Sequence, residues 1–287
     1  MFLLSLAIVF VCLFSYRFSI HSNSKSIYEQ TKVFSKRSYV YKTFDRKRAP
    51  LSLDVFRTSS APVQGAPALL YVHGGSWKHG SKTLNKRWKH IFKRITDKGV
   101  VAISIDYRLY QPKGYRYTDP IEDVEDAVEW VYDHAQELGI DPSRIGLAGA
   151  SAGGHLVLMA AQSNDVASHL SYLIAWYPIT DLKGMVHQSN PVSRIIVERY
   201  MNGTYDMNQE NYRQISPLSY SYAHTPPLLL VHGTGDELVE SSQSIRLARQ
   251  NPTNVHLVLL PKGNHGLINL SIQKSTADTI QYILKNK

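Results

Sequence analysis

The stretch from Arg144 to His155 constrains this chain more than any other. Ile145 to Ala148 is apolar, as in a buried strand, and it runs into Gly149-Ala-Ser-Ala-Gly153, after which an apolar helical segment follows. A serine between two glycines at a strand-to-helix turn is typical of a nucleophile elbow. Side chains at positions 149 and 153 would collide with the neighbouring strand and helix. Ser151 is therefore a candidate nucleophile, although a plain Gly/Ser-rich turn could show the same pattern.

Apolar runs and helical patterns alternate through most of the chain. This alternation predicts an α/β fold, in which a mostly parallel sheet is covered by helices on both faces. Residues 38–44 and 51–57 alternate with period two and indicate an antiparallel pair at a sheet edge. The other expected strands are 66–72, 100–105, 145–148, 173–177, 227–231 and 255–260. The expected helices are 84–97, 119–138, 156–161, 241–249 and 271–284.

The length of 287 residues suits one large α/β domain, which we place at residues 38–287. Residues 182–224 interrupt the alternation of strands and helices and are rich in methionine and tyrosine. We expect this stretch to form a small cap over Ser151. The alternative is an ordinary connection that carries surface tyrosines.

The first 20 residues form a hydrophobic segment of their own. Phe2 to Phe14 carries no charge, but it is shorter than the roughly 20 apolar residues of a spanning helix. No Lys or Arg precedes it, as one would in a secretory signal. We therefore expect residues 1–20 to be an uncleaved anchor or signal-anchor, with a cleaved signal and secretion as the alternative. Residues 21–37 are polar and basic and indicate a linker. The side of the membrane stays open.

The net charge of +9 lies mostly outside the expected domain. Residues 1–50 hold nine basic and two acidic side chains, so the remaining residues are only +2. A basic segment after an apolar one favours contact with a membrane surface over binding of nucleic acid. Cys12 is the single cysteine, so the domain is expected to contain no disulfide, catalytic cysteine or cysteine-bound zinc. We also find no histidine or carboxylate spacing that would hold a metal.

A serine hydroxyl becomes an effective nucleophile when a base lies within hydrogen-bond reach and an acid orients that base. Asp236 follows the strand 227–231 in a glycine-bearing turn, and His265 lies in the loop after the strand 255–260. The carboxyl ends of parallel strands meet at one edge of a sheet, where ligands bind. We expect Ser151, Asp236 and His265 to meet there, together with the turn that contains Gly74 and Gly75.

The order and spacing of six short motifs resemble the α/β-hydrolase fold, in particular the esterase branch related to hormone-sensitive lipase and its small carboxylesterase and feruloyl- or acetyl-esterase-like members. The resemblance covers residues 38–287. It rests on His73-Gly-Gly-Ser-Trp77, Asp106-Tyr-Arg-Leu109, Asp141-Pro-Ser-Arg144, Gly149-Ala-Ser-Ala-Gly-Gly154, His232-Gly-Thr-Gly-Asp236 and Asn264-His-Gly266.

The resemblance implies a role for each matching residue. Ser151 would be the nucleophile, His265 the general base and acid, and Asp236 the carboxylate that orients it. The oxyanion hole would consist of the backbone N–H groups of Gly74, Gly75 and Ala152. Physical chemistry agrees with this assignment, because Ala152 begins a helix, where the dipole favours negative charge. Ser76 stands where many relatives have glycine or a bulkier residue, so the resemblance does not predict the shape of the pocket on the alcohol side.

Several other residues are weighed as rivals or supports. His73 is expected to shape the oxyanion turn through side-chain hydrogen bonds, and His155 to pack or cap. His232 is expected not to be the catalytic base, and Asp181 is the rival acid. Asp106 and Arg108 are expected to brace loops through an ion pair. Trp77 and Tyr177 are candidate substrate-binding residues, with simple packing as the alternative for Trp77.

The expected activity is hydrolysis of small-molecule carboxylic esters with small or medium acyl groups, through an acyl-enzyme and without a cofactor. Two alternatives remain open. One is an arylformamidase or a peptidase that uses the same triad. The other, of a different class, is a catalytically silent binding module on the same fold.

Overall fold

The computed structural model describes residues 34–45, 48–267, 279, 281–283 and 285. The segment expected at 1–20, most of the linker expected at 21–37 and most of the helix expected at 271–284 lie outside these residues. The first strand begins at Ser35, three residues before the start of the strand expected at 38–44. No helix in the described part of the chain has both the length and the apolarity to cross a membrane.

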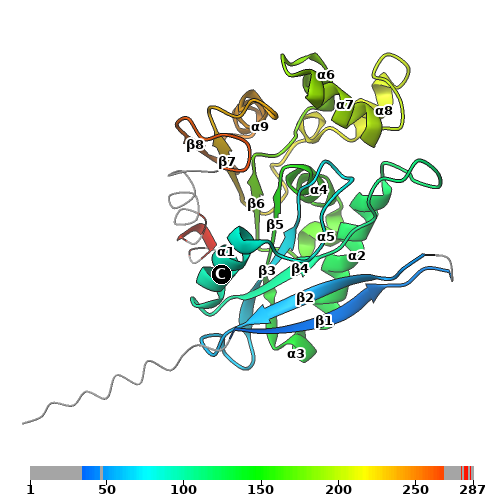
Figure 1. Ribbon diagram of the computed structural model, residues 1–287. Helices are drawn as coiled ribbons and strands as arrows, with labels where there is room; N and C mark the ends of the chain where they lie inside the picture. The colour runs from blue at the N-terminus through cyan, green and yellow to red at the C-terminus, as the bar shows by residue number, and fades with distance from the viewer. Residues whose placement is uncertain (1–33, 46–47, 268–278, 280, 284, 286–287) are drawn as a thin grey trace, which may run out of the picture. The chain divides into compact units, whose positions relative to one another are not determined.

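Strands of the described domain form one eight-stranded sheet in the order β1-β2-β4-β3-β5-β6-β7-β8 (Figure 1). Strands β1 and β2 are antiparallel at one edge, β2 is antiparallel to β4, and all later pairs are parallel. This confirms the predicted edge pair and the mostly parallel sheet. The strands are β1 (Ser35–Lys42), β2 (Leu51–Arg57), β3 (Ala66–Val72), β4 (Val101–Ile105), β5 (Ile140–Ala150), β6 (Tyr172–Trp176), β7 (Leu228–Gly233) and β8 (Val255–Leu260).

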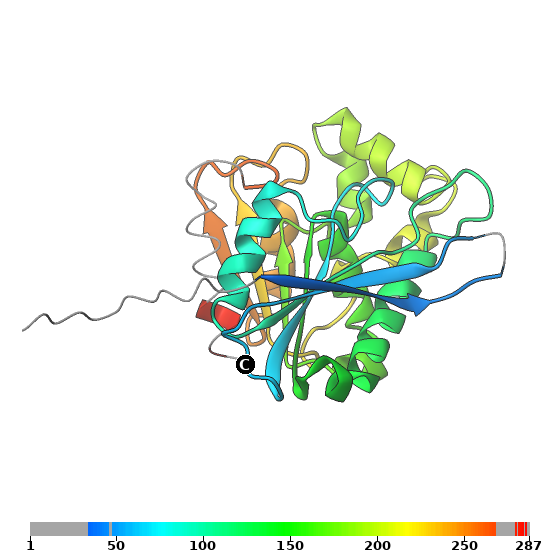
Figure 2. The same ribbon diagram turned by 60° about the horizontal axis from the view of Figure 1, so that its bottom comes forward.

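Helices cover both faces of the sheet (Figure 2). Those in the described residues are α1 (Lys86–Thr96), α2 (Asp119–Asp133), α3 (Ala135–Leu138), α4 (Ala152–Ala160), α5 (Asn164–Ser168), α6 (Leu182–His187), α7 (Pro191–Tyr200), α8 (Gln209–Gln214) and α9 (Ser242–Gln250), with a short 3₁₀ turn η1 (Pro217–Ser219). The helix expected at 119–138 is in fact two. Helix α2 ends at Asp133 with His134 as its C-cap, and Gly139 closes α3 in the left-handed conformation (φ 64°).

The central strands are buried on both faces, which explains their continuous apolar sequences. In β3, Leu70 and Val72 belong to the core that packs on α2 and α4, whereas Leu69 and Tyr71 belong to the core on the α1 side. Such alternation of neighbouring side chains between two cores is possible only in a strand covered on both sides. The sheet is therefore a rigid frame, and its carboxyl edge can hold polar groups at fixed positions.

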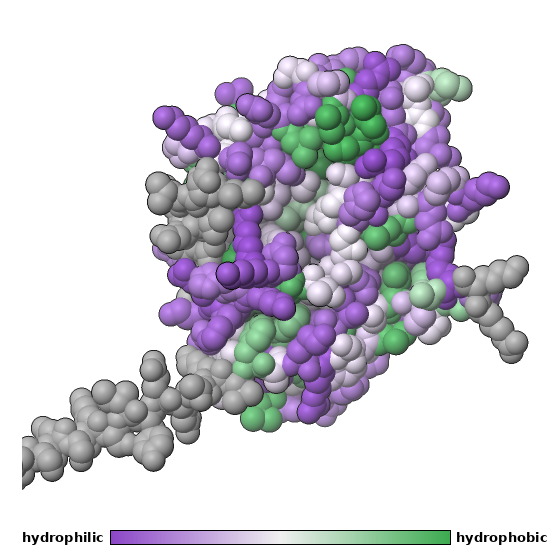
Figure 3. Space-filling view, in the orientation of Figure 1, coloured by the Kyte–Doolittle hydropathy of each residue, from purple (hydrophilic) through white to green (hydrophobic). Residues whose placement is uncertain are grey.

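The 182–224 insertion lies between β6 and β7 and contains α6, α7, α8 and η1. It is tied to the turn after Asp236, because Gln188 Nε2 donates to Leu238 O (2.6 Å) and Asn190 Nδ2 donates to Glu237 O (3.1 Å). Figure 3 shows an apolar surface patch near the top, where Figure 1 places this insertion. The exposed large apolar side chains of the insertion are Val192, Ile195 and Met207.

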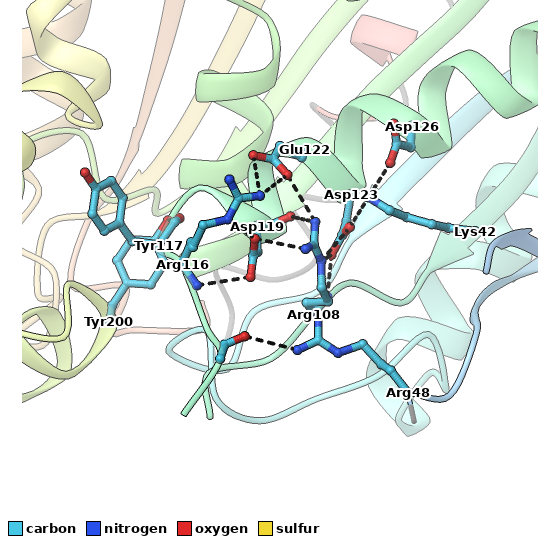
Figure 4. Close-up of polar contacts among 11 residues, drawn as sticks. Lys42, Arg48, Arg108, Arg116, Tyr117, Asp119, Glu122, Asp123, Asp126 and Tyr200 are labelled. Atoms are coloured by element: carbon cyan, nitrogen blue, oxygen red, sulfur yellow. Dashed lines mark hydrogen bonds and ion pairs between the residues drawn. The ribbon is translucent and has the colours of Figure 1, made fainter. Parts of the chain in front are cut away.

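A group of charged side chains, here called the Arg108 cluster, ties α2 to the loop after β4 (Figure 4). Arg108 Nε lies 2.7 Å from Asp123 Oδ2, and Arg108 Nη1 lies 2.9 Å from Asp119 Oδ1. The cluster consists of Lys42, Arg108, Arg116, Asp119, Glu122, Asp123 and Asp126.

The pairing expected around Asp106 and Arg108 needs a correction. Arg108 braces its loop against α2, whereas Asp106 turns to another loop and accepts a hydrogen bond from the backbone N–H of Lys82 (2.7 Å). The Lys82 ammonium also lies 3.5 Å from Asp106. The side chains of residues i and i+2 point to the same face only within a continuous strand. Here β4 ends at Ile105, before both of them.

Candidate active site

Ser151 occupies the sharp turn between β5 and α4 with φ 55° and ψ −120°, a conformation that is strained for any residue with a side chain. A Cβ on Gly149 would lie 2.3 Å from Gly153 O, and a Cβ on Gly153 would lie 2.2 Å from Val72 O. Both distances are far below a van der Waals contact. The two glycines are therefore required by the close approach of the helix and of β3, as the sequence predicted.

The structure brings the three distant residues Ser151, His265 and Asp236 together. His265 Nε2 lies 3.0 Å from Ser151 Oγ, and His265 Nδ1 lies 2.7 Å from Asp236 Oδ2. Because a carboxylate accepts, His265 donates through Nδ1, and Nε2 is left to accept the serine proton. This is the geometry that base-activated nucleophiles share, with both contacts inside 2.6–3.2 Å.

Asp236 is held as a carboxylate by its surroundings. The side chain is buried, which by itself favours the neutral acid, but hydrogen bonds from His232 and His265 outweigh this and lower its pKa to about 2. The backbone N–H groups of Leu238 and Val239 donate to its other oxygen at 3.0 and 2.9 Å. The carboxylate is thus fixed in orientation and charged at neutral pH.

The glycine turn after β3 lies against the nucleophile. A Cβ on Gly74 would lie 2.8 Å from Ala150 O and 3.3 Å from Ser151 Cβ, so only glycine allows the backbone this close. Gly75 has φ 127°, and a Cβ there would meet His79 O at 2.0 Å. Ala152 is the first residue of α4, where helical N–H groups have no partner within the helix. Gly74 and Gly75 line the same cavity as Ser151, and Ala152 directly follows Ser151 in the chain. That their N–H groups form an oxyanion hole stays a prediction.

His73 and Tyr107 support this turn from behind. His73 Nδ1 donates to Gly74 O (2.8 Å), which confirms that this histidine shapes the turn through a side-chain hydrogen bond. The Tyr107 hydroxyl donates to His73 O (3.0 Å), and the two rings stack with centroids 4.3 Å apart. Burial lowers the pKa of His73, so it is neutral and serves as a fixed donor.

A cavity of about 510 Å³ opens at Ser151 and His265. Its walls combine aromatic and aliphatic side chains with a polar rim. Tyr177, a candidate substrate-binding residue, lies in this wall with its ring 4.9 Å from the ring of His265. The side chains that line the cavity include Tyr71, Leu84, Asn85, Trp88, Tyr177 and Leu238, and none comes from the 182–224 insertion.

Trp77 does not line the cavity, so the expectation that it binds substrate gives way to the packing alternative. It is fully buried, with its ring 3.9 Å from that of Tyr200 and edge-on to His155 at 5.1 Å. Ser76 and Trp77 both have positive φ (54° and 55°). This backbone turn directs the indole into the core beneath the glycine turn, where it contacts the insertion.

The rival residues have other partners. Asp181 Oδ2 pairs with Arg246 Nη1 (2.6 Å) and lies in a separate surface cavity beside Lys183 and Tyr205. His155 is buried, donates through Nε2 to Ile215 O (2.8 Å), and has its pKa lowered by burial to about 4. His155 is therefore a packed residue, which is one of the roles expected for it. Asp181, the rival acid, pairs with Arg246, whereas Asp236 contacts His265.

Sequence reasoning missed the residues that shape the cavity on the α1 side. Tyr71 lies on β3 two residues before His73, and Leu84 and Trp88 flank the start of α1. Arg87, also on α1, donates to Gly266 O next to His265. The available signal was the position of Tyr71 at a strand end that leads into a functional turn. The described residues contain no cluster of three His, Cys, Asp or Glu side chains that could hold a metal.

A serine at a strained turn on a mostly parallel sheet, with a histidine and an aspartate after later strands, defines an α/β-hydrolase fold. Residues 53–250 match the family model described as BD-FAE, and the chain belongs to this family. It is 30% identical to esterase LipC of Mycobacterium tuberculosis over 75% of this chain and 56% of that protein. It is also 30% identical to an ethyl acetate hydrolase of Pseudomonas putida, over 76% of this chain and 71% of that protein.

The chain spans about half the length of LipC and of another relative, LipQ (56% and 53%). Among solved structures it is similar to Thermogutta terrifontis esterase 2 phosphoramylated by tabun, with a TM-score of 0.71 and 22% identity over 87% of this chain and 94% of that one. The carboxylesterase EstE1, cloned from a metagenomic library, gives a TM-score of 0.71 at 23% identity over 89% and 90%. At these identities the likeness establishes the fold.

Proposed function

We propose that this protein is a serine hydrolase of carboxylic esters with small to medium acyl groups. The observation that carries the proposal is the continuous hydrogen-bonded line from Ser151 through His265 to the ionised Asp236, at the wall of a cavity. Relatives named as an esterase and as an ethyl acetate hydrolase support the same class of reaction.

The geometry supports an acyl-enzyme mechanism. Ser151 Oγ attacks the ester carbonyl while His265 Nε2 takes its proton, and Asp236 stabilises the imidazolium that forms. The oxyanion of the tetrahedral intermediate accepts hydrogen bonds from the N–H groups of Gly74, Gly75 and Ala152. Removal of one such donor from an oxyanion hole costs about 2.7–4 kcal/mol of transition-state stabilisation. His265 then gives the proton to the leaving alcohol, and water repeats the two steps on the acyl-enzyme.

The test is hydrolysis of short p-nitrophenyl esters by the full chain and by its Ser151→Ala variant. We expect the variant to lose about 10⁵-fold or more in kcat, because the nucleophile is removed, while its circular dichroism stays that of the wild type. Covalent labelling of Ser151 by a fluorophosphonate is the second readout. The solved structure of Thermogutta terrifontis esterase 2 phosphoramylated by tabun motivates this readout. Ester turnover that survives in the alanine variant would contradict the assignment.

Two other functions are compatible with the same three residues. An arylformamidase or a peptidase would show a higher kcat/KM on formyl-anilides or on peptides than on esters, so a parallel panel separates them. A silent binding module would turn over neither and would leave Ser151 unlabelled. A panel of acyl lengths, with acetylated and feruloylated sugars, would identify the substrate class.

A separate proposal concerns the N-terminal segment, and it rests on the sequence. We infer that residues 1–20 anchor the protein to a membrane and that the basic residues after them contact its anionic surface. The alternative is that the segment is cleaved and the domain is secreted. Fractionation of cells that express the full chain or a chain starting at residue 26 tests this. Equal recovery of both in the soluble cell fraction would overturn it.

A further inference from the structure

The carboxylate of Asp236 faces a second imidazole in addition to that of His265. We propose that His232 is a positioning residue of this site, which shares the Asp236 carboxylate with His265 and so sets how strongly that carboxylate stabilises the imidazolium. This inference rests on the proposed hydrolytic function. His232 was set aside as a candidate base from the sequence, and the structure places it on the far side of the acid.

The contacts form one chain of five residues, here called the Asp236 chain. Ser244 Oγ lies 2.7 Å from His232 Nδ1, and His232 Nε2 lies 3.3 Å from Asp236 Oδ2. The same Oδ2 lies 2.7 Å from His265 Nδ1, which in turn is joined to Ser151. The side chains of His232 and Ser244 are fully buried, so water does not compete for these contacts.

The partners of His232 define which ring nitrogen carries hydrogen. Nε2 faces two oxygens that only accept, Val239 O at 2.9 Å and Asp236 Oδ2 at 3.3 Å, so Nε2 is the donor. The closer of the two is Val239 O, and the N–H is shared between them. Nδ1 then accepts from the Ser244 hydroxyl, and a neutral imidazole satisfies every contact. The donor on Nδ1 polarises the ring and makes Nε2–H a stronger donor.

Two consequences follow for His265. The N–H of His232 withdraws negative charge from Oδ2, the oxygen that His265 uses, so it weakens the stabilisation of the imidazolium. Through Val239, whose own N–H donates to Asp236 Oδ1 (2.9 Å), it also holds the turn that presents the carboxylate. His232 therefore affects both the basicity of His265 and its alignment.

Other charged or titratable groups around the chain do not differ between the variants used to test it. Tyr177 packs on His265, and burial raises its pKa to about 12. Arg87 donates to Gly266 O, and arginine side chains stay protonated in proteins. The carboxylates on the turn after Asp236 are those of Glu237, which is exposed, and Glu240, which is half-buried. A difference in pH dependence between variants at position 232 therefore reports on His232.

The experiment compares His232→Leu with His232→Gln in the full chain. The leucine variant removes the donor, whereas the glutamine amide can place an N–H near the position of Nε2. For His232→Leu we expect kcat/KM on a short p-nitrophenyl ester to fall about tenfold. We also expect the acidic limb of its pH profile of kcat/KM to move about half a pH unit upward. The limb moves upward because the protonated form of His265 gains stabilisation. The glutamine variant is expected to restore the wild-type limb and most of the rate.

A purely structural role predicts a lower kcat in both variants with an unmoved acidic limb, and that result would overturn the proposal. If the leucine variant does not fold, as judged by near-UV circular dichroism, Ser244→Ala is used instead. It weakens the same donor and is expected to move the limb in the same direction by a smaller amount; an unmoved limb there would equally contradict the idea.

A second readout does not depend on ester turnover. The ring nitrogens of His265 are followed by NMR in ¹⁵N-histidine-labelled protein, with His265→Gln to assign the signals. The His265 signals of the His232→Leu variant are expected to shift at higher pH than those of the wild type. If the wild type hydrolyses no ester, the proposed function fails, while the NMR titration still decides the role of His232.

Discussion

The Arg108 cluster and the Asp236 chain are two polar groups in one domain that are built on different principles. In the Arg108 cluster, cations and carboxylates alternate, and the Asp123 side chain is fully buried between Lys42 and Arg108. In the Asp236 chain, a single carboxylate serves two imidazoles, and a serine stands at each end. The first group has its charges fixed, whereas in the second only the His265 imidazole is placed to accept the proton of Ser151, and Asp236 stays ionised.

The difference follows from the chemistry of the partners. Guanidinium and carboxylate groups keep their charges near neutral pH, so the Arg108 cluster can only hold the loop that carries Tyr107 against α2. Imidazole changes protonation near neutral pH, so the same kind of carboxylate beside it becomes part of a reaction. Burial of charge therefore supports structure in one region and chemistry in the other.

The largest expected effect comes from Asp236→Asn. Loss of the carboxylate leaves His265 without its orienting partner, and we expect kcat on a short ester to fall about 10⁴-fold, as in other triads. Asp181→Asn is the matched control, because it alters the rival acid that pairs with Arg246. It is expected to leave kcat nearly unchanged. A comparable loss in both variants would contradict the assignment of Asp236.

Next is Arg108→Met, which tests the other side of the comparison. It removes the guanidinium from the buried Asp123, which keeps Lys42 and the backbone N–H of residue 108, and we expect the free energy of unfolding to fall by about 3 kcal/mol in denaturant titrations. The rate of the folded fraction should change far less than in Asp236→Asn. Arg116→Met is the control, because this side chain is 66% exposed and its loss should cost less than about 1 kcal/mol. Equal losses would show that burial does not set the strength of the cluster.

The smallest expected effect concerns Glu125 on α2. Burial, with the nearby carboxylates of Glu122, Asp126 and Glu129, raises its pKa to about 7. A raised acid pKa favours the protonated folded state, so the ionised side chain destabilises the fold progressively from about pH 4.5 to 7. Glu125→Gln should therefore raise the free energy of unfolding at pH 8 by about 1 kcal/mol, reduced by partial exposure, and by nothing near pH 4. A gain that is equal at both pH values would contradict this origin.

Much of the fold and of the candidate site could be predicted from local sequence patterns. The strand β3 is a continuous apolar run because both of its faces are covered, and the glycines at 149 and 153 are required by backbone contacts that no side chain allows. Such features leave a signal in the residues themselves. The convergence of Ser151, Asp236 and His265 could be expected because parallel strands bring the segments after them to one edge.

Other features depend on which surfaces meet, and residue patterns do not contain that information. Trp77 was expected near substrate, but positive φ at positions 76 and 77 turns it into the core against Tyr200. Arg108 was expected to act with Asp106, yet its partners lie on α2. The cavity wall formed by Tyr71 and Trp88 arises from packing of α1 on the sheet.

The sequence by itself determined the elbow, the three residues that meet beside it and the parallel sheet that makes them meet, because each follows from backbone geometry and strand order. Only the tertiary structure decided that Asp236 is shared by two histidines. The sequence shows His232 four residues before Asp236, but their contact requires the turn after β7 to fold back so that one carboxylate oxygen faces both rings. That geometry depends on α9, which supplies Ser244, and on the insertion, which holds the turn in place.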